Sequence, residues 1–119
     1  MAVGGCLFSR TPMALVRELL RQRRHGLTLA RNLTCTEGEF LMVAGAAARI
    51  VTAWMSIGLP WGVSKILRHF VESGRVALEE WSHLALGLRF RAAAARGQAE
   101  VGGRKAHVAR RRRRPDQGR

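Results

Sequence analysis

The sequence predicts a small, mainly α-helical domain followed by a disordered, arginine-rich C-terminal tail. Three observations lead to this prediction. Two segments gather their apolar residues on one helical face, a central stretch is almost uncharged, and residues 91–119 lack the apolar side chains needed for a core. At 119 residues the chain has room for one domain. We divide it into a basic N-terminal segment over 1–35, a small helical domain over 36–90 and the tail over 91–119.

The first predicted element is a basic amphipathic helix over 12–25. Thr11 is a good N-cap, Pro12 suits the first helical position, and Gly26 is placed to end the helix. A basic helix of this kind near an N-terminus is typical of a mitochondrial presequence, and an ordinary surface helix is the alternative. The apolar face holds Met13, Val16, Leu19 and Leu20, and the opposite face holds Arg17, Arg21 and Arg24.

The middle of the chain predicts a loop or a short element over 27–39 and then a hydrophobic helix over 40–63. The second segment carries no charge except Arg49 and is long enough to suggest a membrane span. Arg49 would cost about 2.5–3.5 kcal/mol at the centre of a span, and Gly58 and Pro60 interrupt the far end. We therefore expect a buried helix, with a membrane helix as the alternative.

The clearest helical pattern covers 61–73, after a turn at 58–60 and before Gly74. Its two faces separate cleanly at about 100° per residue. The apolar arc holds Val63, Ile66, Leu67, Phe70 and Val71, and the polar arc holds Ser64, Lys65, Arg68, His69 and Glu72. The following stretch over 75–90 is ambiguous, because its apolar residues fit a helical face and also alternate as in a strand.

The order of turn, amphipathic helix and Gly-x-Val exit is typical of helix-turn-helix modules. Over 58–90 the sequence resembles the winged-helix domain of the isocitrate-lyase-regulator (IclR) family of bacterial transcription factors. The resemblance rests on Gly58-Leu59-Pro60, Val63-Ser64-Lys65-Ile66-Leu67, Glu72-Ser73-Gly74-Arg75-Val76 and Leu86-Gly87-Leu88-Arg89-Phe90. It implies a DNA-binding recognition helix over 61–73 and places 84–90 in the second strand of the wing. The turn is one residue shorter than in the family, and the family's effector domain is absent.

The net charge of +13 favours an anionic partner, and it is concentrated at the ends of the chain. Residues 91–119 hold ten basic and two acidic side chains. This excess of arginine is also what a GC-rich coding sequence produces. The candidate nucleic-acid-binding residues are Ser64, Lys65, Arg68 and His69 on the helix and Arg110, Arg111, Arg112, Arg113 and Arg114 in the tail.

No residue pattern indicates catalysis. Cys6 and Cys35 are far apart and form no metal-binding motif, and the histidines lack converging ligands. We therefore expect no enzyme activity, no metal and no cofactor.

The function predicted from the sequence is nucleic-acid binding, as in a helix-turn-helix transcription regulator. The alternatives are a small membrane-associated or mitochondrial protein and a translated GC-rich frame without an evolved role. The expected partners are nucleic acid, an anionic membrane surface or a second copy of the chain. The expected location is cytoplasmic, nucleoid or nuclear for the first function and mitochondrial if 1–25 is a presequence.

Overall fold

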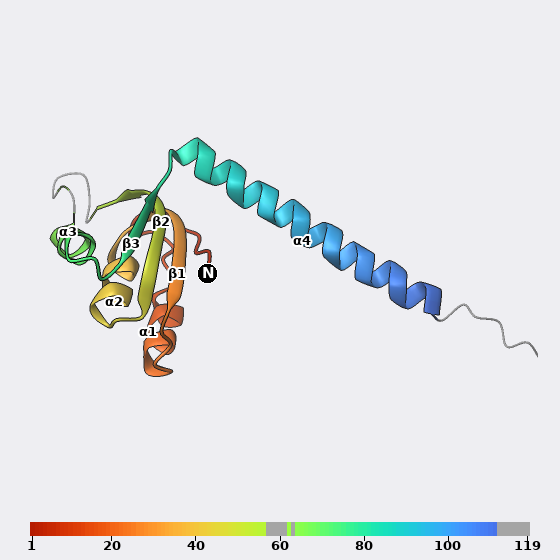
Figure 1. Cartoon of the computed structure of the whole chain (residues 1–119), viewed down its shortest axis with the longest axis horizontal. Coiled ribbons are helices and arrows are strands. Elements are labelled where there is room, and N and C mark those ends of the chain that lie inside the picture. Colours follow the sequence, from red (N-terminus) through yellow and green to blue (C-terminus); the bar gives the residue numbers. More distant parts are fainter. Residues whose placement is uncertain (57–61, 63, 112–119) are drawn as a thin grey trace, which may run out of the picture. The chain divides into compact units, whose positions relative to one another are not determined.

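The computed structural model describes residues 1–56, 62 and 64–111, and it is an α/β fold (Figure 1). The predicted mainly α fold class and the predicted winged helix are therefore wrong. The elements in chain order are α1 (Met13–Arg21), β1 (Leu27–Thr34), α2 (Thr36–Val43), β2 (Ala47–Met55), α3 (Lys65–Glu72), β3 (Ala77–Glu80) and α4 (His83–Arg111).

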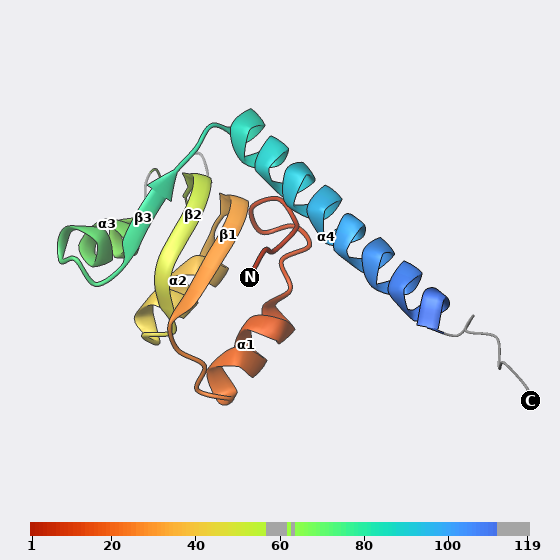
Figure 2. The same ribbon diagram turned by 45° about the vertical axis from the view of Figure 1, so that its right-hand side comes forward.

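The three strands form one parallel sheet in the order β1-β2-β3. Leu29 of β1 pairs with Ile50 of β2, which in turn pairs with Leu78 of β3. Connections between neighbouring parallel strands are almost always right-handed, so two successive crossovers in one direction put their helices on the same face. Figure 2 shows α2 behind the strands and α3 beside β3, and α2 also contacts α3.

The core lies between this face of the sheet and the helices. Its centre holds five side chains with no exposed surface: Val16 of α1, Leu29 of β1, Leu41 and Met42 of α2, and Ile50 of β2. Burying a side chain of this size contributes about 1.5–3 kcal/mol. The first helix, both crossover helices and the sheet are thus held together by one apolar cluster.

The loop alternative for 27–39 and the predicted helix over 40–63 are both wrong. The first segment contains β1 and the start of α2, and the second contains the rest of α2 and all of β2. A strand covered on both sides, as parallel strands usually are, has an almost continuous apolar sequence that periodicity cannot tell from a buried helix. Residues 57–61 and 63 of the second segment, with the predicted turn at 58–60, lie outside the described residues.

The strand predicted over 84–90 is also wrong, because these residues belong to α4. The alternation of leucines reflected no sheet face: Leu86 is buried, whereas Leu84 and Leu88 are exposed. The helix continues to Arg111, across the first part of the segment predicted to be disordered. Alanine and arginine, which dominate that part, are strong helix formers. Residues 112–119 lie outside the described residues.

Two predicted helices are confirmed. The helix predicted over 12–25 is present as Met13–Arg21, with Val16 buried and Arg17 exposed as expected. Its N-cap is Pro12 rather than Thr11, whose hydroxyl donates to the carbonyl of Leu7. The helix predicted over 61–73 is present as Lys65–Glu72.

Two further observations concern the chain as a whole. Its contacts divide it into two compact units, residues 1–86 and 87–119. Among the described residues, no helix is both long and apolar enough to cross a membrane. The division into 1–35, 36–90 and 91–119 stays a prediction.

Candidate functional site at the carboxyl edge of the sheet

The carboxyl ends of the parallel strands lie at one edge of the sheet. In open α/β sheets, ligands bind in the crevice outside this edge. The strands β1, β2 and β3 end here at Thr34, Met55 and Glu80, and α4 begins three residues after the last of them. This edge is therefore the first place to look for a functional site.

The N-terminal segment brings another part of the chain to the same edge. Residues 1–3 run parallel to β1, with an isolated bridge between Ala2 and Ala30. The amide of Val3 donates to the carbonyl of Ala30 (3.0 Å), and the amide of Ala30 donates to the carbonyl of Met1 (2.8 Å). A parallel neighbour runs toward the same edge as β1, and Leu7 of the following loop over 4–11 lies beside Leu33 and Trp54 at the carboxyl edge.

This loop is tight and its backbone is strained. Cys6 and Ser9 exchange two backbone hydrogen bonds of 3.0 and 2.8 Å. Leu7 and Arg10 have positive φ angles of 48° and 57°, which cost of order 1–3 kcal/mol for residues other than glycine. At Gly5, with φ 101°, an added Cβ would lie 2.8 Å from backbone oxygens of the loop. Such a loop persists only where its surroundings fix it.

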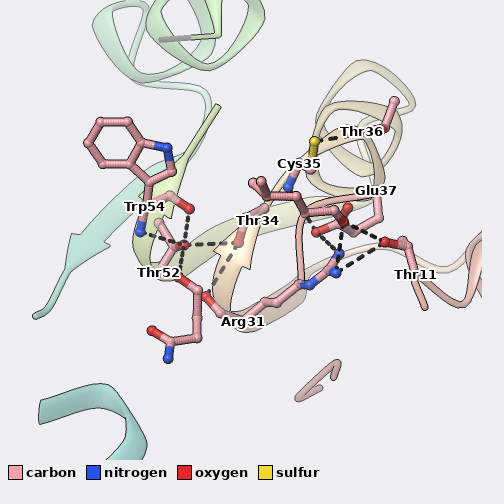
Figure 3. A network of polar contacts seen from close by, with 10 residues as sticks. Thr11, Arg31, Thr34, Cys35, Thr36, Glu37, Thr52 and Trp54 are labelled. Atoms are coloured by element: carbon pink, nitrogen blue, oxygen red, sulfur yellow. Dashed lines mark hydrogen bonds and ion pairs between the residues drawn. The ribbon is translucent and has the colours of Figure 1, made fainter. Parts of the chain in front are cut away.

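A buried ion pair fixes it. Arg31 of β1 and Glu37 of α2 are both fully buried and face each other through Nη1 and Oε1 (Figure 3). The Nη2 of Arg31 donates to the carbonyl of Leu7 and to the hydroxyl of Thr11, at 3.0 Å each, and the amide of Cys35 donates to Oε1 of Glu37 at 3.0 Å. Arg31 thus joins the N-terminal loop to the β1–α2 corner.

The pair is not fully satisfied by the described residues. The Nε of Arg31 and the Oε2 of Glu37 have no hydrogen-bond partner there, and Nη1 approaches Glu37 as an ion pair without hydrogen-bond alignment. Removing either partner would leave a buried charge, which is far more costly than the pair itself.

Two threonines join the ends of β1 and β2. The buried hydroxyl of Thr34 donates to the hydroxyl of Thr52 (2.9 Å), which donates to the carbonyl of Trp54 (2.9 Å) (Figure 3). The amide of Trp54 in turn donates to Thr52 Oγ1 (3.3 Å). These contacts fix the backbone of Trp54, whose side chain is 44% exposed.

A cavity of about 370 Å³ opens at this edge and is lined by Leu7, Leu33, Trp54 and His83. The four residues come from the N-terminal loop, the end of β1, the end of β2 and the first turn of α4. The Nδ1 of His83 lies 2.9 Å from Oδ1 of Asn32 on β1. With the amide oxygen as the acceptor, Nδ1 carries the proton and Nε2 is left for a ligand.

The residues predicted to bind nucleic acid within residues 1–86 are not among the described residues that line this cavity. Ser64 is buried: its hydroxyl accepts from the amide of Leu67 as the N-cap of α3 and donates to Glu39, so it has no access to a phosphate. The other three residues of the predicted site on the helix, Lys65, Arg68 and His69, are exposed on α3. Arg110 and Arg111 belong to α4, and Arg112, Arg113 and Arg114 lie outside the described residues.

Titration and metal chemistry do not single out another site. The pKa of Glu18 is lowered because Arg21, and to a smaller extent Gln22, donate hydrogen bonds to it, and the same contact raises the pKa of Arg21. Both groups are exposed on α1. In the described part of the chain, no three His, Cys, Asp or Glu side chains gather as a metal site would require.

The cavity residues Leu7, Leu33 and His83 were not predicted from the sequence. One signal was available: the Gly4-Gly5 pair stands between a short apolar run and the helix that begins after Thr11-Pro12. In α/β folds, a ligand-binding edge often contains a strand followed by a glycine-containing loop and a helix.

Comparison with known proteins gives two similarities, and no family model matches the chain. In sequence, the chain is 36% identical over 95 residues to an uncharacterised protein of Archaeoglobus fulgidus. That match covers 79% of this chain and 21% of the relative. In structure, the chain superposes on glutaconate coenzyme A-transferase from Acidaminococcus fermentans with a TM-score of 0.72 and 26% identity. The superposition covers 79% of this chain and 30% of the transferase chain.

The fold resembles part of a coenzyme A-transferase. This similarity points away from nucleic-acid binding, so the predicted function as a helix-turn-helix regulator is wrong. The alternative of a membrane-associated protein with a hydrophobic helix over 40–63 is wrong as well, because that segment contains β2. The expected locations, homo-oligomer and membrane-surface partner stay predictions.

Proposed function

We propose that this chain supplies a thioester-binding part of a coenzyme A-transferase. The observation that carries the proposal is the structural similarity to glutaconate coenzyme A-transferase, at a TM-score of 0.72 and 26% identity over 79% of the chain. The chain spans 30% of the length of that transferase chain and about a fifth of the archaeal relative, so the proposal concerns a part of such an enzyme. It replaces the expectation from the sequence that the chain has no enzymatic role.

The reaction exchanges coenzyme A between two carboxylic acids. The C–S bond of a donor thioester breaks, a new C–S bond forms to the carbonyl carbon of the acceptor, and one carboxylate oxygen of the acceptor ends on the donor acyl group. The result is a free donor carboxylate and an acceptor thioester, with no oxidant or reductant needed.

The described residues support a binding role in this exchange rather than a nucleophilic one. Glu37 and Glu39, the two carboxylates that follow β1, are buried and engaged with Arg31 and Ser64. Neither is free to attack a thioester. The cavity is mostly apolar and opens at the edge where α/β sheets bind ligands.

Arg10 is the residue best placed to meet the phosphates of coenzyme A. It is exposed on the same strained loop that carries Leu7 into the cavity wall, and its φ is 57°. A guanidinium is suited to phosphate because its donors match two oxygens at once. A strained backbone at an exposed arginine is what a ligand-binding loop shows.

The test is isothermal titration of the full chain with coenzyme A at low salt. We expect saturable binding that Arg10→Ala weakens about tenfold, the value of one charge-assisted hydrogen bond to phosphate. Arg17→Ala is the matched control, since Arg17 is exposed on α1 and is not part of the loop, and it should leave the Kd unchanged.

Because the chain has a net charge of +13, a further control must distinguish specific binding of coenzyme A from binding of any polyanion. Tripolyphosphate at the concentration of coenzyme A should displace it only weakly. Full displacement, equal effects of the two arginine variants, or no binding of coenzyme A would each overturn the proposed function.

A further inference from the structure

We infer that the carboxyl-edge cavity selects an apolar acyl group, so that the thioester taken by this protein carries a hydrocarbon acyl chain rather than a second carboxylate. This inference rests on the proposed function and deepens it. It concerns what the cavity accepts, whereas the proposed function concerns coenzyme A itself.

The chemistry of the cavity wall is the first argument. Three of its four described residues, Leu7, Leu33 and Trp54, are apolar, and His83 is the fourth. At about 370 Å³ the cavity is within the range of small-molecule sites, which are mostly apolar with a few placed polar groups. Among the described lining residues there is no Arg, Lys, Asp or Glu.

The cost of a second carboxylate is the second argument. The structural neighbour is named for glutaconate, an acyl group with a carboxylate at its far end. A carboxylate moved from water into an apolar cavity loses its hydration and needs a cation or several donors in return. The nearest buried arginine, Arg31, is already engaged by Glu37, Leu7 and Thr11.

The rigidity of the wall is the third argument. Leu7 is held through its carbonyl by Arg31, Trp54 through its backbone by Thr52, and His83 through its ring by Asn32. A wall fixed at three points discriminates by shape and polarity because it cannot rearrange to solvate a charge. His83 is the polar residue of the described wall, and the thioester would lie beside it.

The experiment compares four ligands on the full chain by isothermal titration: coenzyme A, butanoyl-coenzyme A, hexanoyl-coenzyme A and glutaryl-coenzyme A. Each buried methylene should tighten binding about fourfold, so hexanoyl-coenzyme A should bind more than tenfold tighter than butanoyl-coenzyme A. Glutaryl-coenzyme A should bind more weakly than butanoyl-coenzyme A.

Two variants test the site. Leu33→Lys places a cation in the wall and should remove the preference for hexanoyl-coenzyme A while improving the binding of glutaryl-coenzyme A relative to butanoyl-coenzyme A. Leu84→Lys is the matched control, because Leu84 is 73% exposed and outside the wall, and it should change none of the four Kd values. Circular dichroism establishes that the variants fold. If Leu33→Lys does not fold, Leu7→Lys in the loop serves the same purpose.

The outcomes separate the two proposals. Failure of coenzyme A and all thioesters to bind overturns the proposed function. Binding of coenzyme A with equal Kd values for all acyl groups, or a preference for glutaryl-coenzyme A, overturns the apolar selection alone. A chain-length preference that Leu33→Lys and Leu84→Lys reduce equally also overturns it.

Discussion

Replacing Arg31 by Met should destabilise the protein far more than removing any exposed arginine. The change leaves Glu37 as a buried carboxylate whose remaining described partner is the amide of Cys35. Breaking a buried pair in this way costs about 3–5 kcal/mol. It also removes the hydrogen bonds to Leu7 and Thr11, each worth about 1 kcal/mol.

A double-mutant cycle measures this coupling. We expect Arg31→Met and Glu37→Leu each to cost about 3–5 kcal/mol, and the double variant to cost at least about 2 kcal/mol less than their sum, because it buries no charge. Urea denaturation followed by circular dichroism gives the free energies, and the single variants should lower the midpoint by on the order of 2 M.

The exposed pair of Arg49 and Glu79 provides the control. Its nitrogen and oxygen are 3.6 Å apart and the Arg49 side chain is 55% exposed. Arg49→Met should therefore change stability by less than about 1 kcal/mol. If Arg31→Met is no more costly than Arg49→Met, or if the two buried substitutions are additive, the role given to the buried pair is wrong.

A second measurement tests the role of Arg31 in the loop. The amides of Cys6 and Ser9 are hydrogen-bonded across the loop, so they should exchange slowly with solvent in the wild type. Arg31→Met should lose that protection at urea concentrations where the sheet is still folded. Unchanged protection of both amides would show that Arg31 stabilises the sheet without ordering the loop.

Three smaller predictions follow from individual positions. Gly38→Ala should lower the free energy of unfolding, measured by urea denaturation, by about 1–3 kcal/mol, because its Cβ would lie 2.6 Å from a methyl of β1 and 3.0 Å from one of β2. Gly87→Ala should instead raise it by about 0.5–1 kcal/mol, because Gly87 lies in a helix and an added Cβ there meets open space. Ser64→Ala should cost about 2–4 kcal/mol, since it removes the N-cap of α3 and the partner of a buried carboxylate, and a loss below 1 kcal/mol would contradict this. Arg21 lowers the pKa of Glu18, so the contribution of this contact to stability is present at neutral pH. The contribution disappears as the pH falls through the lowered pKa of Glu18. An NMR titration should show the midpoint of Glu18 at a higher pH in Arg21→Ala.

The sequence correctly predicted the helices that expose one face to solvent and bury the other. In α3 the exposed Lys65 and Arg68 alternate at helical spacing with the buried Leu67, so the pattern is complete within the helix itself. The same holds for α1, where Val16 is buried and Arg17 exposed. Such a pattern records the difference between water and core, and it needs no knowledge of the rest of the fold.

The strands were missed because their surroundings are set by distant parts of the chain. In β1 the leucines at 27, 29 and 33 alternate as a strand should, but Arg31 falls on the same face and makes the pattern look broken. Arg31 is fully buried because Glu37, Leu7 and Thr11 supply its partners, and none of these is visible as a partner in the sequence. In β2 the apolar run fits a buried helix equally well.

The residue that concealed β1 is also the one that organises the candidate site. An arginine in the middle of an apolar face is tolerated only where its charge and its donors are met by partners arriving from elsewhere. Here the partners are a strained loop that carries a cavity residue and a carboxylate at the start of the crossover helix. Arg31 therefore interrupts the regular apolar pattern of the strand, and it also fixes the position of the cavity wall through Leu7. Arg31 interrupts the apolar face of β1, and the partners that make this possible lie at the ligand-binding edge. Departures of this kind from local sequence patterns are expected at functional sites.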